Sequence, residues 1–503
     1  MAENDYTKEL IRYLAETGFV WGPAPEIYGG LAGFYDYGPL GKLLKNNVEN
    51  AIRHVFIKNN FWEVECPTIM PAKVWEASGH LSGFTDPMIQ CSKCDNGFRV
   101  DTLIEEFAGD VKVGGLKDEE LLELIDKHNI KCPSCKSSFK KEIIKHNMMM
   151  KTKVGVSTEV FNRPETATTT YLPFKRLDEF FRRKLPFGVF QIGKAYRNEI
   201  SPRQHLLRQR EFTQAEGQLF IFGHEKNNFD RFKDVENAEL PLWTFDEQTE
   251  KAPVKMIKLK DAMSRKVLKN QAYAWTLNVA YQLFVEMGIP KEKVRFRQHD
   301  PNELAFYADD AWDVEVKLES FGWTEVCGVH DRTDYDLKQH SKFSGEKLEA
   351  YDEEKKERLV PHILEIAFGS DRPTFTLLDI FYDPTDEQRK CLRLPPKLAP
   401  IKAGIYPLVN KEKLPDIAKS IYNELIQDFV VTYDKGGSIG RRYARADWRG
   451  IPYGITIDFD SMKNNDVTLR ERDSQDQVRI KINDVKKIIT DLINGTIEFK
   501  DLK

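Results

Sequence analysis

The sequence predicts an α/β protein of several domains, in which a long α+β part with antiparallel strands and insertions precedes a smaller α/β domain. Three observations lead to this prediction. At 503 residues the chain is too long for a single hydrophobic core. Before residue 394 helices and strands are mixed, and the strand Phe187–Tyr196 with its return toward Glu216 is predicted to be an antiparallel pair. Beyond the proline-rich segment 394–400, strands and helices alternate along about 100 residues.

Composition and the first residues exclude several classes of protein. Hydrophobic residues make up 41% of the chain and charged residues 31%, which indicates a globular protein. The net charge of −4 provides no overall attraction for nucleic acid, so any RNA contact must come from local basic patches. The start resembles neither a secretory signal nor a transit peptide, and no apolar stretch is long enough to span a membrane. We therefore expect a cytoplasmic protein without membrane contact.

The predicted boundaries divide the chain into a body in three parts, two insertions and a C-terminal domain. The body takes residues 1–82, 151–222 and 293–393, the insertions take 83–150 and 223–292, and the last domain takes 394–503. In the body, apolar spacing predicts a helix over Lys42–Asn59, a strand over Phe61–Ile69 and a helix over Leu172–Leu185 with Phe180 on its buried face. Neighbouring strands are predicted at Val314–Leu318 and Gly322–Gly328, and a strand, a glycine turn and a helix at Pro361–Ile380.

The triplet Arg197-Asn198-Glu199 follows the predicted strand Phe187–Tyr196, and an antiparallel return leads to Glu216. Ser201, Pro202 and Arg203 are predicted to form the turn between them. Arginine suits phosphate binding because its planar fork pairs two oxygens and keeps its charge. The hairpin could thus clamp a polyphosphate, although cross-strand ion pairs on a solvated face would give the same pattern.

Two C-x-x-C pairs in the first insertion indicate a metal site. They are Cys91-Ser-Lys-Cys94 and Cys132-Pro-Ser-Cys135, and two such turns can complete a tetrahedral zinc site. Four thiolates would leave no open position, so this zinc would be structural. The alternative is a set of unrelated surface thiols. In a cytosolic chain, the seven cysteines favour thiols or metal ligands over disulfides.

Two further segments join polar residues to turns. Arg163-Pro-Glu-Thr-Ala167 fixes a carboxylate beside a proline, and an ordinary loop is the alternative. Glu365-Ile-Ala-Phe-Gly-Ser-Asp-Arg372 places an arginine in the first turn of a predicted helix, where it could bind an anion or pair with Asp371.

Taken together and in this order, these segments resemble motifs 1 to 3 of the class II aminoacyl-tRNA synthetases. More narrowly, the chain is similar to the dimeric, single-chain type of glycyl-tRNA synthetase. Long strings support this resemblance across nearly the whole chain. They are Gly30–Gly41, Ser78-Gly-His80, Phe84–Pro87, Phe98-Arg-Val-Asp101, Arg163–Ala167, Arg197–Arg203, Arg295–His299, Asp331–Leu337 and Ser438–Tyr443.

The resemblance implies a class II antiparallel-sheet catalytic domain and a C-terminal anticodon-binding domain. It implies that ATP and Mg²⁺ activate glycine, which is then transferred to the 3′ end of tRNA(Gly). Arg197 would bind the α-phosphate, Arg208 and Arg372 the β- and γ-phosphates, and Phe212 and Glu199 the adenine. Arg197, Glu199 and Arg372 would be the catalytic residues. Asn198, Gln209, Glu325 and Val326 complete the implied ATP site, with Glu325 as a magnesium ligand.

For glycine, the resemblance implies an acidic pocket too small for a methyl group. Its positions are Arg99, Glu165, Glu216, Glu365 and Ala367. The third motif here reads Glu365-Ile366-Ala367 where the family has Glu-Pro-Ser or Glu-Pro-Ala, and His340–Ser344 also departs from the family pattern, so no function is assigned to it.

Three further expectations concern partners. Arg441, Arg442, Arg445 and Arg449, interleaved with aromatic residues, would bind tRNA, although a solvated surface turn is the alternative. Residues 223–292 could contact the acceptor stem. A homodimer is implied, with the helix over Lys42–Asn59 and the strand up to Pro67 between the subunits.

Two other function classes remain at this point. A non-catalytic nucleic-acid-binding relative, like the accessory subunit of mitochondrial DNA polymerase, would lack Arg197, Glu199, Arg208 and Arg372, which are all present. A class II ligase for threonine, proline or histidine would need a different amino-acid pocket than this acidic cluster provides.

Overall fold

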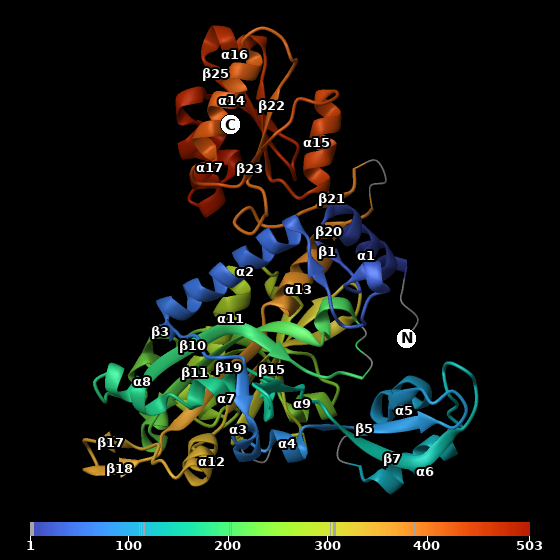
Figure 1. Cartoon of the computed structure of the whole chain (residues 1–503). Coiled ribbons are helices and arrows are strands. Elements are labelled where there is room, and N and C mark those ends of the chain that lie inside the picture. The colour runs from blue at the N-terminus through green and yellow to red at the C-terminus, as the bar shows by residue number, and fades with distance from the viewer. Residues whose placement is uncertain are drawn as a thin grey trace.

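The computed structural model describes residues 5–109, 111, 113, 116–200, 202, 204–301, 303–304, 308–385 and 389–503. Within the predicted hairpin turn, Ser201 and Arg203 lie outside these residues. Figure 1 shows a large central body, a small insertion beside it and a C-terminal domain above it. No helix in the described part of the chain is long and apolar enough to cross a membrane.

Across the described residues, the central body contains one sheet of nine strands, in the order β13-β12-β14-β15-β16-β19-β11-β10-β3. In that order the strands are Lys255–Lys258, Glu239–Trp243, Val294–Gln298, Asp310–Leu318, Gly322–Asp331, His362–Gly369, Glu211–Ile221, Phe187–Tyr196 and Phe61–Glu63. All neighbours are antiparallel except the pairs β12–β14 and β10–β3. The predicted antiparallel sheet is therefore confirmed.

One face of this sheet is apolar and is covered by helices α2 (Pro39–Lys58), α11 (Gln271–Glu286) and α13 (Asp371–Phe381), as Figure 1 shows. Helix α2 begins at Pro39, which suits a first helical position, and its stripe of Leu44, Val48, Ile52 and Phe56 is fully buried. Because side chains alternate along a strand, the opposite face receives the polar residues of the same strands.

Short helices lie on this side of the sheet, where Phe187, Val189, Phe220 and Ile363 form a second apolar cluster beside the polar residues. These helices are α3 (Ala72–Ala77), α7 (Ala167–Tyr171), α8 (Phe174–Phe180) and α12 (Tyr335–Ser344). The other elements of the body are α1 (Asp5–Thr17), β1 (Val20–Trp21), β2 (Asp36–Tyr37), β4 (Ile69–Pro71), α4 (His80–Gly83), β8 (Lys151–Val154), β9 (Thr158–Asn162), α9 (Phe245–Thr249), α10 (Leu259–Ser264), β17 (Ala350–Asp352), β18 (Glu357–Leu359), β20 (Tyr382–Asp383) and β21 (Cys391–Leu392).

The first insertion has its own small core. It consists of β5 (Thr85–Cys91), β6 (Gly97–Arg99), β7 (Phe139–Asn147), α5 (Val100–Ala108) and α6 (Asp118–Lys127). The sheet order is β6-β5-β7, and the helices pack against it around Val100, Leu103 and Ile104.

The C-terminal domain alternates strands and helices, as predicted. Its sheet has the order β23 (Val431–Tyr433), β22 (Ala403–Pro407), β24 (Tyr453–Ile457), β25 (Asp466–Glu471) and β26 (Gln477–Lys481). Helices α14 (Leu414–Leu425) and α17 (Val485–Asn494) share one core with this sheet. Helix α15 (Ile439–Trp448) lies on the other side, and the short α16 (Phe459–Asn464) follows β24 (Figure 1).

Two local predictions differ from the structure, and a third segment, predicted to be an insertion, contributes to the main sheet. The predicted strand Phe61–Ile69 is two strands in different sheets, β3 and β4, because Pro67 interrupts the pairing. The predicted helix Leu172–Leu185 is replaced by α7 and α8, which meet at Pro173, and Phe180 is 61% exposed instead of buried. Residues 223–292 are not peripheral, since β12 and β13 extend the main sheet and α11 is part of the main core.

Candidate active site

Strand register gathers polar residues from distant parts of the chain on the polar face of the main sheet. Glu216 on β11 lies opposite Ala367 on β19, and the next cross-strand row pairs Gln218 with Glu365. On the other side of β19, His330 lies opposite Glu365. Residues two apart on a strand share a face, so both rows point away from the apolar core.

Three carboxylates, Glu165, Glu216 and Glu365, come together beside helix α7. Each accepts a short hydrogen bond from a hydroxyl on or next to this helix: Thr168 Oγ1 to Glu165 at 2.6 Å, Thr166 Oγ1 to Glu216 at 2.5 Å, and Tyr171 OH to Glu365 at 2.6 Å. One short helix thus fixes the orientation of all three acids.

The three carboxylates differ in charge state. Burial, reinforced by the negative charges of Glu365 and Glu165, raises the pKa of Glu216 to about 8. Burial also acts on the pKa of Glu165, but the nearby His80 ring and the Arg332 guanidinium outweigh it and lower that pKa. The pKa of Glu365 is likewise lowered, because Arg332 and His330 outweigh its burial.

His80, His330 and Arg332 are therefore part of the site, and the sequence alone did not reveal their role. His80 Nε2 lies 3.4 Å from a Glu165 oxygen, Arg332 Nη1 lies 3.2 Å from Glu365, and His330 Nδ1 lies 3.5 Å from the same Glu365 oxygen. His80 and Arg332 fall in the sequence strings Ser78–His80 and Asp331–Leu337, which carried the family resemblance without an assigned role.

Arg197 lies at the end of β10, on the same side of the sheet as the carboxylates. Its Nε donates to Pro164 O at 3.1 Å, and its guanidinium carbon lies 5.4 Å from the ring centres of both Phe84 and Phe212. Its backbone N–H donates to Arg210 O at 2.9 Å. The head group is thus held in place by one hydrogen bond and two rings, while part of its surface stays accessible.

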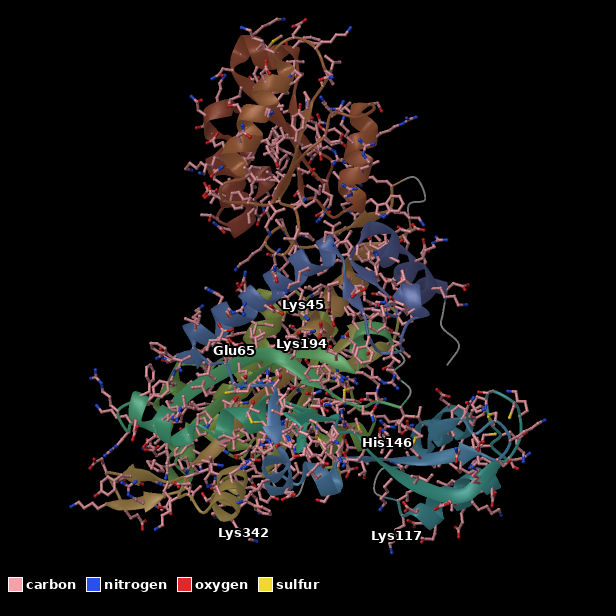
Figure 2. All side chains as sticks on the ribbon, in the orientation of Figure 1. Lys45, Glu65, Lys117, His146, Lys194 and Lys342 are labelled. Carbon is pink, nitrogen blue, oxygen red and sulfur yellow. The ribbon has the colours of Figure 1, made fainter. Side chains whose placement is uncertain are left out.

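Two other predicted cations are held in ion pairs. Arg208 Nε donates to the buried Glu199 at 2.9 Å, and Arg372 Nη1 donates to Glu325 Oε1 at 3.0 Å. Asp371 does not pair with Arg372. It accepts instead from Lys45 Nζ at 2.5 Å and from Tyr37 OH at 2.6 Å inside the core, where Figure 2 labels Lys45.

The remaining predicted ATP residues occupy varied environments. The Glu325 side chain is 53% exposed, and that of Val326 is fully buried, so only the Val326 backbone could face a ligand. Gln209 is buried and donates to Leu206 O at 3.0 Å. Asn198 N–H donates to Met148 O at 2.8 Å, and His146 Nε2 lies 3.1 Å from Asn198 O, which joins the insertion to the hairpin near the label in Figure 2.

Arg99 is not brought to the three carboxylates. Its guanidinium pairs with Asp86 at 3.1 Å and donates to Asp101, both within the insertion, and in the described part of the chain no contact joins it to Glu165, Glu216 or Glu365. Glu199, on the hairpin, is close enough for its negative charge to contribute to the raised pKa of Arg99. The sequence could not show this, because Arg99 is the last residue of β6, in an insertion with its own core.

The four cysteines of the insertion form one cluster. Their sulfur atoms all lie within 4.8 Å of one another, with Cys91 Sγ 3.4 Å from Cys135 Sγ and Cys94 Sγ 3.7 Å from Cys132 Sγ. Tetrahedral zinc with bonds of about 2.3 Å places its sulfur ligands about 3.8 Å apart. The donor set and its spacing are thus compatible with zinc.

Three of the predicted tRNA-binding arginines lie on helix α15, where the sequence had assigned no element, and Arg449 follows directly as its C-cap. Arg441, Arg445 and Arg449 are exposed. Arg442 is not, since its side chain is 2% exposed and donates to Pro407 O at 2.6 Å and Leu408 O at 3.1 Å. Arg442 therefore links α15 to its own domain and differs from the expectation of an RNA contact.

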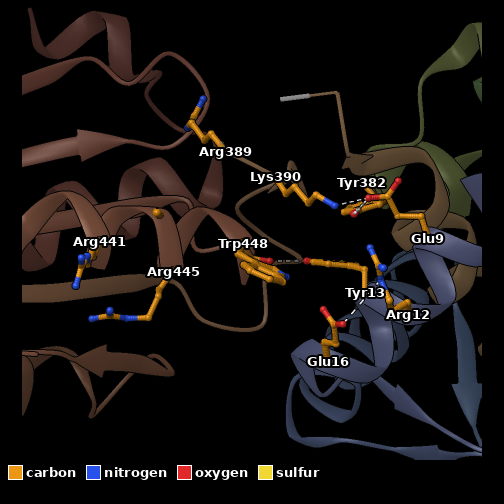
Figure 3. A pocket seen from close by; sticks show the side chains of 11 residues that line it. Glu9, Arg12, Tyr13, Glu16, Tyr382, Arg389, Lys390, Arg441, Arg445 and Trp448 are labelled. Atoms are coloured by element: carbon orange, nitrogen blue, oxygen red, sulfur yellow. Dashed lines mark hydrogen bonds and ion pairs between the residues drawn. The ribbon is translucent and has the colours of Figure 1, made fainter. Parts of the chain in front are cut away.

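Helix α15 faces α1 across a cavity of about 470 Å³ between the C-terminal domain and the body (Figure 3). Its lining includes the cations Arg12, Lys390, Arg441 and Arg445 and the ring of Trp448. Tyr13 OH donates to Trp448 O at 2.5 Å, which ties the two parts together.

Two domain families match the chain. The tRNA synthetase class II core domain (G, H, P, S and T) matches residues 158–381, and the anticodon binding domain matches residues 402–492. A glycine–tRNA ligase of Methanococcus maripaludis is 40% identical over 97% of this chain and 100% of its own length. That of Pyrococcus horikoshii is 38% identical over 98% and 99%.

The chain belongs to the glycine–tRNA ligase family. It has the class II catalytic core and anticodon-binding domain that the resemblance implied, and the prediction of an aminoacyl-tRNA ligase is confirmed. A prolyl-tRNA synthetase of Cryptosporidium parvum has the same fold, with a TM-score of 0.59, 13% identity, and coverage of 98% of this chain and 79% of that one. Membership of this family favours the first of the three function classes over the other two.

Proposed function

We propose that this chain activates glycine with ATP to glycyl-adenylate and transfers glycine to the 3′ end of tRNA(Gly). The observation that carries this proposal is the cluster of Glu165, Glu216 and Glu365 on the same sheet face as Arg197. An amino acid without a side chain presents only an ammonium and a carboxylate. The acids offer partners for the ammonium, and the arginine would attract the phosphate that the carboxylate attacks.

The first reaction step requires no protein nucleophile. The glycine carboxylate attacks the α-phosphorus of ATP, and pyrophosphate leaves, so the protein must align the two reactants and neutralise charge. Arg197 is proposed to bind the α-phosphate, with Phe212 next to it as a flat surface for adenine. Glu199 is proposed to accept from the adenine amine.

Arg208 and Arg372 are proposed to bind the β- and γ-phosphates after leaving the ion pairs that now hold them. The Arg372–Glu325 pair is partly exposed on both sides, so its rearrangement costs little, whereas Arg208 is partly exposed but leaves a buried partner, Glu199. Glu325 is proposed to hold Mg²⁺ together with ATP phosphates. Its half-exposed carboxylate suits an ion that keeps several waters and neutralises phosphate charge.

Alanine is proposed to be excluded by close packing. A Cβ atom added to Gly193 would lie 2.2 Å from Arg163 Nη2, and one added to Gly369 would lie 3.1 Å from Thr213 O. Both glycines lie opposite Gln214, so the sheet has little spare room along the row next to that of Glu216. Steric exclusion of a methyl group gives a specificity that needs no second, hydrolytic site.

We further propose that tRNA contacts the exposed Arg441, Arg445 and Arg449 of α15, and that the four cysteines bind structural zinc. A homodimer is proposed through the surface around β3, where Ile57, Trp62 and Phe180 are more than half exposed. Trp62 and Phe180 lie in contact, with ring centres 5.6 Å apart, and exposed apolar groups of this kind are typical of subunit interfaces.

The test is ATP–pyrophosphate exchange with each amino acid in turn. We expect glycine-dependent exchange and none with alanine, serine, proline, threonine or histidine. Exchange with another amino acid, or none with any, would contradict the proposal. Charging of tRNA(Gly) transcript with labelled glycine then tests the second step separately.

A further inference from the structure

Two glutamines on the polar face of the main sheet have the same burial but opposite bonding. Gln191 and Gln218 are both 0% exposed. Gln191 Oε1 accepts from Arg163 Nη1 at 2.8 Å and from Cys66 N–H at 2.9 Å, and its Nε2 donates to Thr170 Oγ1 at 2.9 Å. In contrast, neither Nε2 nor Oε1 of Gln218 has a partner among the described residues.

The position of Gln218 places its amide beside the acidic cluster. It follows Glu216 by two residues on β11, so both side chains lie on the same face of the sheet. Glu365 is its direct cross-strand neighbour on β19, and Val189 is its neighbour on β10. On this face its neighbours in the sheet are thus two acidic residues, Glu216 and Glu365, and two apolar ones, Val189 and Phe220.

A buried carboxamide without partners opposes folding, since it loses its bonds to water and gains none. A methionine of similar length would cost less at this position. Native proteins satisfy such groups with ordered water or with a ligand, and a water needs two or more polar partners. Gln218, Glu216 and Glu365 provide those partners, so a small hydrogen-bonding occupant fits here and a hydrocarbon does not.

We propose that Gln218 is a positioning residue of the glycine site, which acts through one ordered water shared with Glu216 and Glu365. The inference rests on the proposed function. The water donates one O–H to the Gln218 Oε1 atom and the other to an oxygen of Glu216 or Glu365, and it accepts from Gln218 Nε2 or from the ammonium of glycine. The ammonium brings three donors, and the carboxylates alone fix only part of its orientation.

A neutral amide suits this role better than another acid. It adds an acceptor without adding a fourth negative charge to three buried carboxylates. Like charges in a shared site hinder one another's ionisation, and an uncharged acceptor avoids that effect. Gln218 thereby orients the ammonium without changing the net charge of the cluster.

The experiment compares Gln218→Met with the matched control Gln191→Met in pyrophosphate exchange and thermal unfolding. For Gln218→Met we expect KM for glycine to rise about fivefold to tenfold, the size of one missing hydrogen bond, with kcat within about twofold and KM for ATP unchanged. Its Tm should equal or exceed that of the wild type. Gln191→Met should lower Tm, because it leaves Arg163, the Cys66 N–H and Thr170 without their partner.

A third variant separates positioning from packing. Gln218→Glu keeps the shape and an acceptor but adds a carboxylate, so the pH dependence of KM for glycine should move to higher pH. An unchanged KM for glycine in Gln218→Met, a drop in Tm as large as that of Gln191→Met, or an unmoved pH profile in Gln218→Glu would each overturn the inference. If wild-type protein shows no glycine-dependent exchange, the proposed function itself has failed.

Discussion

The polar face of the catalytic sheet and the surface of helix α15 both concentrate charge, but they hold it differently. On the sheet, Glu216 and Glu365 are buried, and each accepts a hydrogen bond of 2.6 Å or less from a fixed hydroxyl. On α15 and at its C-cap, Arg441 and Arg449 are exposed, and Arg445 pairs with Asp434 at the surface. A charge in a low-dielectric, preorganised site acts strongly on one ligand. Exposed charges are each weakened by the surrounding water, so several of them must act together.

The strongest test of this difference is Arg197→Ala. We expect pyrophosphate exchange to fall by about 100-fold to 1,000-fold, because the variant lacks one positioned donor to the reacting phosphate. Lys194→Ala is the matched control on the same strand, since Lys194 is exposed and its ion-pair partner in the described part of the chain is Glu211 at 3.0 Å. It should exchange at the wild-type rate. Retention of activity within tenfold in Arg197→Ala would show that this arginine does not act on the reacting phosphate.

Removal of metal from the four cysteines tests whether the folded insertion helps to position the residues of the polar face. We expect the purified protein to contain one zinc per chain, and Cys132→Ser to release it and unfold the insertion. Exchange should fall about tenfold, because Asn198 would no longer be held by Met148 and His146. Hydrogen exchange of residues 85–147 would report the unfolding. Fully reduced, folded protein without zinc would exclude the four-cysteine site.

The pKa of Glu216 predicts a pH dependence that the arginine-rich helix should not share. Since this pKa is raised to about 8, only about one-tenth of the carboxyl is ionised at pH 7. The charged form attracts the ammonium, so KM for glycine should fall up to about tenfold as pH rises from 7 to 9. Glu216→Gln should raise KM and flatten this profile. A flat profile in the wild type would mean that Glu216 is already ionised at neutral pH.

The smallest effects are expected on α15. Arg441→Ala or Arg449→Ala should weaken tRNA binding only a few-fold and reduce the slope of log affinity against log salt by about one for each phosphate that the variant no longer binds. Glycine-dependent exchange should not change, because the helix lies in another domain. Lys463→Ala on α16 is the control for general charge. Unchanged affinity and salt slope would place the tRNA elsewhere.

The sequence by itself determined the class of fold and much of the chemistry. Local spacing placed α2, β15, β16, β19 and the alternation of strands and helices in the C-terminal domain, although not α15, because amphipathic periods report which face each element buries. The C-x-x-C pairs and the strings around Arg197 identified residues whose chemistry depends on a few neighbours in the chain. Glu165, Glu216 and Glu365 were named from resemblance alone.

Only the tertiary structure decided which residues surround those acids. His80 and Arg332 come from separate segments and contact Glu165 and Glu365. Asp371 pairs with Lys45 in the core and not with Arg372. Arg442 is buried, whereas Arg441 and Arg445 on the same helix are exposed. The amide of Gln218 is likewise left unpaired by strands that come from distant parts of the sequence. Burial and charge pairing depend on contacts between distant segments, and these fix the pKa of Glu216, which local sequence cannot encode.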